Sequence, residues 1–267
     1  MRESPIPPPR RTSGGDRVPR VALVTGGARR LGRAMALGLA ADGWDVAVHC
    51  HGSAAAAGEV AALIEARGRQ AAVVRADLAR EEAAAEVIDA AVAALGPIGL
   101  LVNNASIFEL DRLETADRES WARHIEINLR APVVLIQGFA ARLPAEAEGL
   151  VVNMLDQRVL NLTPNFLSYS VSKAGLWAAT QVLARQLAPR IRVNAIGPGP
   201  ALKPAAVADA DWAELERSVP LRRGTSPEEI VAALRFIVDA RSMTGQLVTL
   251  DGGMQMGWLT PGIKQLD

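Results

Sequence analysis

The chain has 267 residues, 49% of them apolar and 4% aromatic, and its 29 basic side chains balance its 29 acidic ones. This balance argues against nucleic acid or a membrane surface as a partner, and no apolar run reaches the ~18 residues that a membrane span requires. The single cysteine, Cys50, excludes an internal disulfide, which is typical of a reducing compartment. We therefore expect one cytoplasmic α/β domain, a class for which this length is ordinary.

The N-terminal segment, residues 1–19, is rich in proline, arginine and glycine. Its Arg10–Arg11 pair resembles an export signal, but the next apolar run, VALVTGG, has the character of a strand and no cleavage site follows it. We expect residues 1–19 to form a disordered tail and residues 20–267 to form the single domain.

Beyond the tail, apolar runs typical of buried strands alternate with runs of helical periodicity. The predicted strands cover residues 21–27, 45–51, 70–78, 99–106, 149–156, 191–199 and 246–253. The predicted helices cover residues 31–43, 53–68, 81–95, about 119–143, about 168–187 and about 227–240. The last helix follows a capping box, Ser226-Pro227-Glu228-Glu229, with proline at its first position.

The strand candidates are continuous apolar runs, which is how strands look when both faces of their sheet are covered. Repeated βαβ units then predict a single-domain, Rossmann-type α/β fold: a doubly wound, parallel, seven-stranded sheet with helices on both faces. The segment 200–223 follows the sixth strand at the carboxyl edge, where such folds bind ligands, and we expect a substrate-covering loop with a short helix. The apolar extension 254–267, with Trp258 and Leu259, is expected either to cross a subunit boundary or to close the pocket.

The motif TGGARRLG, residues 25–32, lies between the first strand and the first helix. Gly26 and Gly27 permit a tight turn and a close approach to phosphate, and Gly32 permits close packing of helix on sheet. The free N–H groups of the helix N-terminus then favour a diphosphate. A purely structural turn is the alternative, but this position in a βαβ unit predicts a dinucleotide site.

The second strand distinguishes NAD from NADP, because NAD enzymes usually end it with an acid that binds the ribose 2′-hydroxyl. Here the stretch is His49-Cys50-His51-Gly52-Ser53, without an acid. Arg29 and Arg30 instead offer planar donors for a 2′-phosphate, and His51 and Ser53 add further donors. We therefore predict NADPH, with solvated surface arginines as the alternative.

Asp77 ends the third predicted strand, and two roles fit it equally. Its carboxylate can accept a hydrogen bond from the adenine amino group, or it can cap the next helix. The predicted cofactor contacts are Gly26, Arg29, Arg30, Leu31, Gly32, His51, Gly52, Ser53, Asp77, Leu78, Asn104, Ala105, Ser106, Tyr169, Lys173 and Gly199. No metal site is predicted.

The segment YSVSK places Tyr169 and Lys173 four residues apart, on one face of the predicted helix 168–187. A nearby cation lowers the pKa of a tyrosine from ~10 toward neutrality, which makes the phenol a usable general acid. Lys173 can also hold the nicotinamide ribose. Asn128, within the helix 119–143, is expected to bind a water or the helix backbone and tie Lys173 into a proton path.

Taken in order, TGGARRLG, NNAS (103–106), Asn128, YSVSK and GPG (197–199) resemble the short-chain dehydrogenase/reductase family over about residues 20–253. Three positions depart from the family pattern: Arg30 and Ser106 stand where most members have glycine, and Asp156 stands where most have serine, thirteen residues before the tyrosine. All three resemble the pteridine reductase branch, which includes dihydromonapterin reductase-like proteins. Gly52 departs from that branch, because an arginine is common there.

The resemblance to this branch implies an Asp–Tyr–Lys catalytic set, and Phe108 matches the phenylalanine that sandwiches the pterin against the nicotinamide. The implied catalytic residues are Asp156, Tyr169, Lys173 and Asn128, and the implied substrate contacts are Ser106, Phe108, Asp156 and Tyr169. A carboxylate at position 156 repels a developing alkoxide but accepts from the ring N–H and amino groups of a pterin. A strand-end cap for Asp156, and a core or lid role for Phe108, are the alternatives.

The predicted reaction is therefore the NADPH-dependent reduction of a dihydropterin (dihydrobiopterin, dihydromonapterin or dihydrofolate) to its tetrahydro form. A general carbonyl or 3-oxoacyl reductase is one alternative, and a non-catalytic NADP-binding protein is another. The helices 119–143 and 168–187 carry apolar residues on several faces, and in the family this pair forms a four-helix interface, so a homotetramer is expected. The apolar residues that support it are Val133, Leu135, Phe139, Leu176, Trp177 and Leu183.

Overall fold

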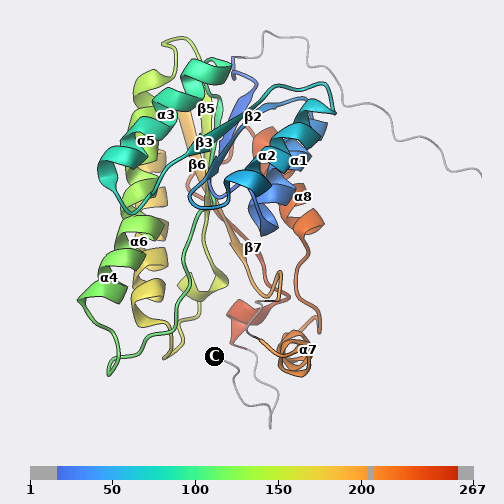
Figure 1. Ribbon diagram of the computed structural model, residues 1–267. Coiled ribbons are helices and arrows are strands. Elements are labelled where there is room, and N and C mark those ends of the chain that lie inside the picture. The colour runs from blue at the N-terminus through green and yellow to red at the C-terminus, as the bar shows by residue number, and fades with distance from the viewer. Residues whose placement is uncertain (1–16, 204–206, 258–267) are drawn as a thin grey trace, which may run out of the picture.

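A computed structural model describes residues 17–203 and 207–257 of the chain and shows one parallel sheet of seven strands in the order β3-β2-β1-β4-β5-β6-β7 (Figure 1). Each strand falls within a range predicted from the sequence, so the predicted fold is confirmed. The strands are β1 Val21–Val24, β2 Asp45–Cys50, β3 Ala71–Arg75, β4 Leu100–Asn103, β5 Gly149–Met154, β6 Ile191–Pro198 and β7 Leu247–Leu250.

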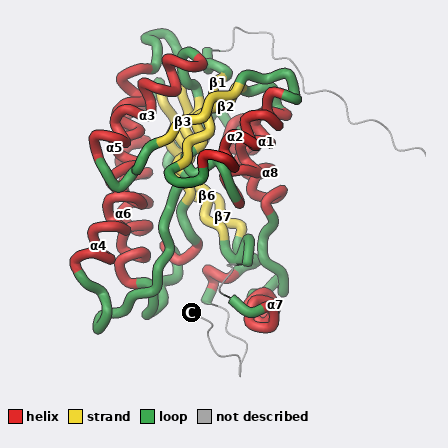
Figure 2. The backbone as a smooth tube through the Cα atoms, viewed as in Figure 1, coloured by secondary structure: helices red, strands yellow, loops and turns green. Residues whose placement is uncertain are grey.

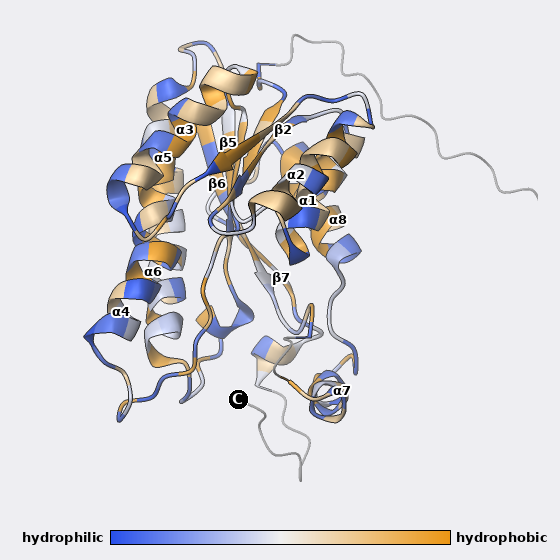
Figure 3. Ribbon diagram, viewed as in Figure 1, coloured by the Kyte–Doolittle hydropathy of each residue, from blue (hydrophilic) through white to orange (hydrophobic). Residues whose placement is uncertain are grey.

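Helices cover both faces of the sheet, and each face has its own apolar core (Figures 1 and 2). One face packs against α1 Arg30–Ala41, α2 Ala54–Glu65 and α8 Pro227–Asp239. The other packs against α3 Glu81–Leu95, α5 Ala131–Arg142 and α6 Leu167–Leu187. The hydrophobic colour marks strands of the sheet and also stretches of the helices that cover it (Figure 3). Burial on both faces explains why the strands are continuous apolar runs.

The order of the strands reverses beside β1, which pairs with β2 on one side and with β4 on the other. After β1 the chain moves outward to β2 and β3, and it then returns to β4 and continues in the opposite direction. In open α/β sheets, this switch point leaves a crevice at the carboxyl ends of the strands, where ligands bind. The crevice between the ends of β1 and β4 therefore positions the site described below.

Several elements differ in detail from the sequence-based expectation. The expected helix 119–143 consists of α4 Arg118–Ile125, a π-helical turn η1 Glu126–Arg130, and α5. The loop 200–223 contains the expected short helix, α7 Asp209–Ser218, and 3-10 turns cover η2 Gln157–Val159 and η3 Met254–Met256. The capping box of α8 is confirmed, because the Ser226 side chain and the Glu229 side chain each accept from the other's backbone N–H.

The expected tail boundary at residue 19 is wrong by a few residues, because the chain already packs against the domain at residue 17. The carbonyl of Arg17 accepts a 3.0 Å hydrogen bond from the Glu148 N–H, and Val18 packs against an apolar core. Residues 1–16 lie outside the described residues, as do Trp258 and Leu259. Within the described ranges, no helix has both the length and the apolar character needed to cross a membrane.

Candidate active site

A cavity of about 820 Å³ opens at the carboxyl edge of the sheet. Most of the residues predicted for the site line it, from seven separate segments of the chain. They are Gly26, Arg29, Arg30, Leu31, Gly32, His51, Asp77, Leu78, Asn104, Ala105, Ser106, Phe108, Asp156, Tyr169 and Gly199. Of the other predicted residues, Asn128 and Lys173 are buried behind this surface, and Gly52 and Ser53 lie outside the lining.

The glycine loop forms a cradle that no side chain can enter. Gly26 has φ +61°, and a Cβ on Gly32 would lie 2.2 Å from the Gly26 carbonyl oxygen. The side chain of Asn104 donates to the carbonyls of Thr25 (2.8 Å) and Gly26 (3.3 Å), which ties the end of β4 to this loop. The first turn of α1 follows directly, so its N–H groups face the cradle and fit a diphosphate.

His49 lies beneath the glycine loop and was not assigned a role from the sequence. Its Nδ1 accepts a 3.2 Å hydrogen bond from the Gly26 N–H, and its Nε2 lies 3.2 Å from the Ala76 carbonyl. An accepting Nδ1 requires the neutral ring with its proton on Nε2. Burial lowers the pKa of His49 from 6.5 to about 4, so the ring stays neutral near pH 7. The feature of the sequence that could have indicated this role is a histidine within an otherwise apolar strand.

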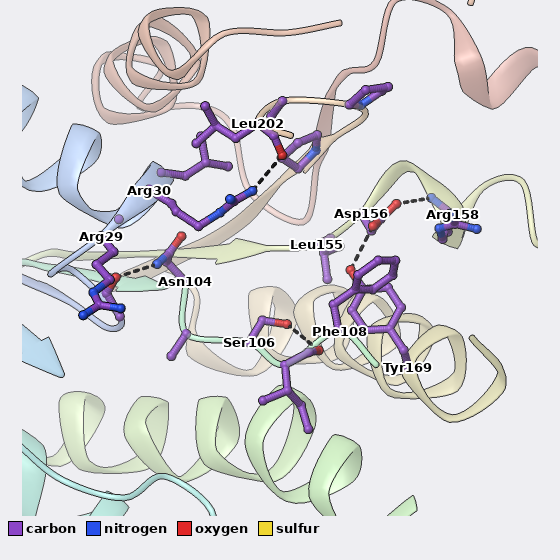
Figure 4. Close-up of a pocket in the computed structure, with 18 of the residues that line it drawn as sticks. Arg29, Arg30, Asn104, Ser106, Phe108, Leu155, Asp156, Arg158, Tyr169 and Leu202 are labelled. Carbon is purple, nitrogen blue, oxygen red and sulfur yellow. Dashed lines mark hydrogen bonds between the residues drawn. The ribbon is translucent and has the colours of Figure 1, made fainter. Parts of the chain in front are cut away.

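The two arginines of the glycine loop have different environments. Arg29 is exposed and lines the cavity. Arg30, which has φ +50°, reaches across the cavity and donates to the carbonyls of Leu202 (2.7 Å) and Lys203 (3.3 Å) (Figure 4). Both arginines are exposed, but Arg30 joins the glycine loop to the expected substrate loop, whereas Arg29 lines the cavity at the cofactor loop.

Asp77 does not cap the next helix, so that alternative is wrong. The N-cap of α3 is Arg80, three residues further along, because β3 ends at Arg75 and an additional turn precedes the helix. The Asp77 carboxylate accepts from the Ala79 N–H (3.0 Å) and lies 4.0 Å from His51 Nε2. It lines the cavity, where it is available to an adenine amino group.

Asp156 and Tyr169 are in direct contact (Figure 4). The Tyr169 phenol donates a 2.8 Å hydrogen bond to Asp156 Oδ2, while Asp156 Oδ1 accepts from the Arg158 N–H at 2.9 Å. Asp156 follows β5, and Tyr169 lies in the first turn of α6 and is 5% exposed. The carboxylate therefore caps the short turn η2 with one oxygen and contacts the phenol with the other. The expected cap and a position in the site do not exclude each other.

The expected lowering of the Tyr169 pKa is wrong, because the pKa of Tyr169 is raised. Burial raises the pKa of Tyr169 well above its usual value of 10, and the neighbouring Asp156 carboxylate raises it further. The Lys173 ammonium is buried, lies 5.9 Å from the centre of the phenol ring and donates to the Met154 carbonyl at 2.8 Å. Burial lowers the pKa of Lys173 from 10.5 to about 8. The phenol is therefore a firmly protonated donor at neutral pH.

Asn128 is fully buried in the π-helical turn η1, a type of turn that is frequent at functional sites. Its Oδ1 accepts from Ser106 Oγ (3.0 Å) and the Ile107 N–H (2.9 Å), and its Nδ2 donates to the Ile107 carbonyl (3.0 Å) and Ser172 Oγ (3.1 Å). Among the described residues, Asn128 and Lys173 share no direct hydrogen bond, and a path between them through water stays a prediction. Asn128 positions the segment that leads to Phe108.

Phe108 belongs to an aromatic cluster at the cavity mouth. Phe108 is 47% exposed, and its ring stacks on Phe166 (centroids 4.1 Å apart, 13° between planes) and makes a T-shaped contact with Tyr169 (4.7 Å, 76°). The Arg158 guanidinium lies 5.1 Å from the Phe166 centroid and 5.8 Å from that of Phe108. The sequence alone assigns no role to Phe166 or Arg158, because only the folded chain brings them beside Phe108.

The fold and this site together define a Rossmann-type oxidoreductase, in which a dinucleotide cradle meets a buried tyrosine and lysine. A family model described as enoyl-(acyl carrier protein) reductase matches residues 26–255. The chain belongs to the short-chain dehydrogenase/reductase family, as the motifs predicted.

Individual relatives agree with this assignment. A 3-oxoacyl-[acyl-carrier-protein] reductase from Synechocystis sp. is 32% identical over 240 residues, which cover 88% of this chain and 97% of the relative. The solved FolM alternative dihydrofolate reductase 1 from Brucella canis, complexed with NADP, is 43% identical, with a TM-score of 0.85 and coverage of 92% of this chain and 98% of that one. Its counterpart from Brucella suis, also with NADP, has the same identity and coverage and a TM-score of 0.87. The cofactor in both structures is the one that the sequence predicts for this chain.

Proposed function

We propose that this protein uses NADPH to reduce a dihydropterin to its tetrahydro form. The observation that carries this proposal is the 2.8 Å hydrogen bond between the Tyr169 phenol and Asp156. A ketone reductase needs a donor at that position to stabilise the alkoxide, and losing one such donor costs ~10²–10³ in rate. A pterin instead presents ring N–H and amino donors, which the Asp156 carboxylate can accept.

The residues of the cradle would hold the cofactor. Gly26 and Gly32 leave room for the diphosphate at the N-terminus of α1, and Arg29 is available to the 2′-phosphate. Lys173 is buried behind the cavity wall and would hold the nicotinamide ribose from there. When bound, NADPH supplies the hydride. The chain's own task is then to hold the pterin flat and to deliver one proton to a ring nitrogen.

Phe108 and the Asp156–Tyr169 pair divide that task. The exposed face of Phe108 offers a stacking surface beside the edge of Tyr169. Tyr169 gives up its proton to the ring nitrogen, and Asp156 replaces it by passing on a proton taken up from solvent. The positive charge of Lys173 offsets the negative charge that the pair carries during this exchange. The two FolM alternative dihydrofolate reductases, at 43% identity, support a pterin substrate.

A 3-oxoacyl reductase is the second candidate, because a reductase of that name from Synechocystis sp. is 32% identical over 240 residues. Asp156 opposes it for the electrostatic reason given above. The two candidates are separated by measuring NADPH oxidation with dihydrobiopterin, dihydromonapterin, dihydrofolate and an acetoacetyl thioester.

We expect turnover of at least one dihydropterin and little of the thioester, and Tyr169→Phe should abolish that turnover. Turnover of the thioester alone would establish the second candidate. Tight NADPH binding without turnover of any of these compounds would point to a non-catalytic NADP-binding protein.

We also propose that the protein is a homotetramer built through α4, α5 and α6. Leu135, Phe139 and Leu176, three of the residues on which the sequence-based argument relied, are buried within the single chain and offer nothing to a partner. Trp121 (38% exposed) and Val182 (54%) lie on the outer side of these helices and support an apolar interface. Sedimentation equilibrium of the full chain tests this, and a monomer at micromolar concentration contradicts it.

A further inference from the structure

The loop between β4 and α4 carries Phe108, and buried side chains hold its backbone on both sides of that residue. On one side, Asn128 bonds to the N–H and the carbonyl of Ile107, at 2.9 and 3.0 Å. On the other side, His124 Nε2 accepts a hydrogen bond from the Glu109 N–H at 3.3 Å. His124 and Asn128 are fully buried and lie four residues apart along α4 and η1. Phe108 is therefore fixed between two anchors from one helical segment.

His124 also reaches the catalytic helix α6, which lies beside α4 (Figure 1). Because its Nε2 accepts, the neutral ring carries its proton on Nδ1. That Nδ1 lies 2.7 Å from Ser168 Oγ and 3.0 Å from the Ser120 carbonyl, so it can donate to both. Ser168 is fully buried and directly precedes Tyr169, the proposed proton donor. One imidazole thus connects the Phe108 loop with the residue before the phenol.

Asp111, three residues after Phe108, makes a second connection between the same two elements. Its backbone carbonyl accepts from the N–H groups of Phe166 (2.9 Å) and Leu167 (3.3 Å). Its buried carboxylate accepts from the Ser168 N–H (3.1 Å) and from the Ser168 hydroxyl. The N-cap of α6 is Phe166, whose side chain has no acceptor, so a residue of the Phe108 loop caps the catalytic helix in its place.

We propose that His124 and Asp111 are positioning residues, which set the distance between the surface on which the pterin stacks and the phenol that protonates it. They act through Phe108 and Tyr169, whose ring centres are 4.7 Å apart (Figure 4). A misplacement of about 1 Å between reacting groups can cost ~10²-fold in rate. This inference rests on the proposed pterin reduction and adds to it the residues that align the substrate with its proton donor.

A cluster that served only the stability of the fold would contain the same hydrogen bonds, but its loss would have different effects. His124, Asp111 and Ser168 are all absent from the lining of the cavity, so none of them is placed to contact the cofactor or the pterin directly. Loss of a purely structural contact lowers the free energy of unfolding and leaves the folded enzyme as active as before. Loss of a positioning contact changes kcat or the KM for the pterin in a protein that stays folded and binds NADPH normally.

The first comparison removes one buried hydroxyl on either side of Tyr169. Ser168→Ala deletes the hydroxyl that joins His124 to Asp111. Ser170→Ala deletes a hydroxyl that has no hydrogen-bond partner among the described residues, so it is the matched control. We expect Ser168→Ala to lower kcat for the preferred dihydropterin by about tenfold to a hundredfold and to change the dissociation constant of NADPH by less than about threefold. Ser170→Ala should change both by less than about threefold.

The second comparison separates the two bonds of His124. In His124→Asn the short amide can take the place of Nδ1 toward Ser168 but does not reach Glu109, so the Phe108 loop loses an anchor. We expect KM for the dihydropterin to rise by about tenfold. In His124→Gln the longer amide can still accept from the Glu109 N–H, so this variant should keep the parent's KM and show a lower kcat. Circular dichroism and titration with NADPH verify that each variant is folded.

Equal values of kcat in Ser168→Ala and Ser170→Ala overturn the proposal. A loss of NADPH affinity in Ser168→Ala as large as its loss in kcat also overturns it, because the cluster would then support the fold as a whole. The proposal is equally wrong if His124→Asn and His124→Gln, both folded, have the same KM and the same kcat. If a His124 variant does not fold, the two serine variants decide alone.

Failure of the proposed reaction is recognised separately. If the parent reduces only the acetoacetyl thioester, pterin reduction is wrong, and the two serine variants assayed on the thioester still decide whether the cluster positions Tyr169. If the parent reduces none of the compounds, biopterin is titrated into the protein saturated with NADP. Weaker binding to His124→Asn than to His124→Gln then supports the anchoring of Phe108, and equal binding overturns it. If biopterin does not bind at all, both proposals are wrong.

Discussion

The Tyr169 phenol donates its proton toward a carboxylate, Asp156 Oδ2, at 2.8 Å. This contact couples the acidity of the tyrosine to the charge of its neighbour. Burial raises the pKa of Tyr169 well above 10, and the carboxylate raises it further, because a phenolate beside it would place two negative charges at hydrogen-bond distance. Tyr169 therefore cannot release a proton and remain ionised, and a proton must return to the pair during each turnover. A substrate with a basic ring nitrogen and N–H donors is suited to such a pair.

Asp156→Ser tests this coupling directly. The serine hydroxyl cannot pass a proton on to Tyr169 at neutral pH, so we expect kcat/KM for the preferred dihydropterin to fall by about a hundredfold. Reduction of an acetoacetyl thioester should stay level or rise, because the substitution restores a donor for an alkoxide. Initial rates of NADPH oxidation measure both.

Asp239→Asn, an exposed position at the end of α8, is the control for loss of one carboxylate. The interpretation of Asp156 is contradicted if Asp156→Ser leaves dihydropterin turnover intact while it raises thioester reduction above the parent. That result would establish the ketone reductase and would make Asp156 an obstacle to catalysis.

The pH dependence of the reaction should follow Lys173. Its pKa is lowered from 10.5 to about 8 by burial, so the ammonium is charged below that pH and neutral above it. Tyr169 stays protonated over the same range, because its pKa is raised. Once Lys173 is neutral, its charge no longer offsets the negative charge of the Asp156–Tyr169 pair. We therefore expect kcat/KM, whose pH dependence reports the pKa values of the free enzyme, to decline above about pH 8.

The Lys173→Arg variant tests whether the decline in kcat/KM comes from the deprotonation of Lys173, since a guanidinium keeps its charge throughout the range. The variant should be slower but should lose the decline near pH 8. A decline at the same pH in both proteins would assign it to a group other than Lys173.

The sequence predicted the architecture because each strand is an apolar run and each connection is long enough for a helix. The resemblance to the pteridine reductase branch grouped Asp156 with Tyr169, and the two side chains are in hydrogen-bond contact. The direction of the Tyr169 pKa shift could not be predicted in this way. The spacing of Tyr169 and Lys173 shows that they share a helix face, but it does not show how deeply the phenol is buried or that a carboxylate touches it.

Residues that act through tertiary contacts were missed for the same reason. Phe166 and Arg158 lie between the predicted strand 149–156 and the predicted helix 168–187, and their relation to Phe108 depends on how that connection folds. His49 lies in an apolar strand, where a buried histidine looks like part of the core. Asn128 was expected within a regular helix, whereas the π-helical turn aims its amide at the Ser106 loop.

His49 leads to a prediction on stability. Its pKa is about 4 in the folded protein and 6.5 when unperturbed, so between these values the unfolded chain binds a proton that the native one does not. The contribution of His49 to the free energy of unfolding is therefore fully present above pH 6.5 and is lost as the pH falls toward 4. Its size is on the order of 3 kcal/mol. Urea denaturation of the parent and of His49→Leu across this range measures it.

His49→Leu should be less stable than the parent at neutral pH by about 1–3 kcal/mol, because the Gly26 N–H loses its acceptor, and its stability should vary less with pH. His51→Leu, whose side chain is 70% exposed, should retain the parent's pH dependence. If His49→Leu loses as much stability on acidification as the parent, the effect belongs to other groups.

The glycine cradle leads to a final comparison between two substitutions of the same kind. A Cβ on Gly32 would lie 2.2 Å from the Gly26 carbonyl oxygen and 2.6 Å from Asn104 Nδ2, so Gly32→Ala must displace the loop that fits the diphosphate. We expect its dissociation constant for NADPH to rise at least about tenfold, which corresponds to ~1.4 kcal/mol. Gly58 lies inside α2 with no atom within 4 Å of its added Cβ, so Gly58→Ala should stabilise the protein by up to about 1 kcal/mol and leave NADPH affinity unchanged. Fluorescence titration with NADPH and thermal unfolding without it measure the two effects separately. If Gly32→Ala binds NADPH as tightly as Gly58→Ala does, the diphosphate does not lie against this cradle.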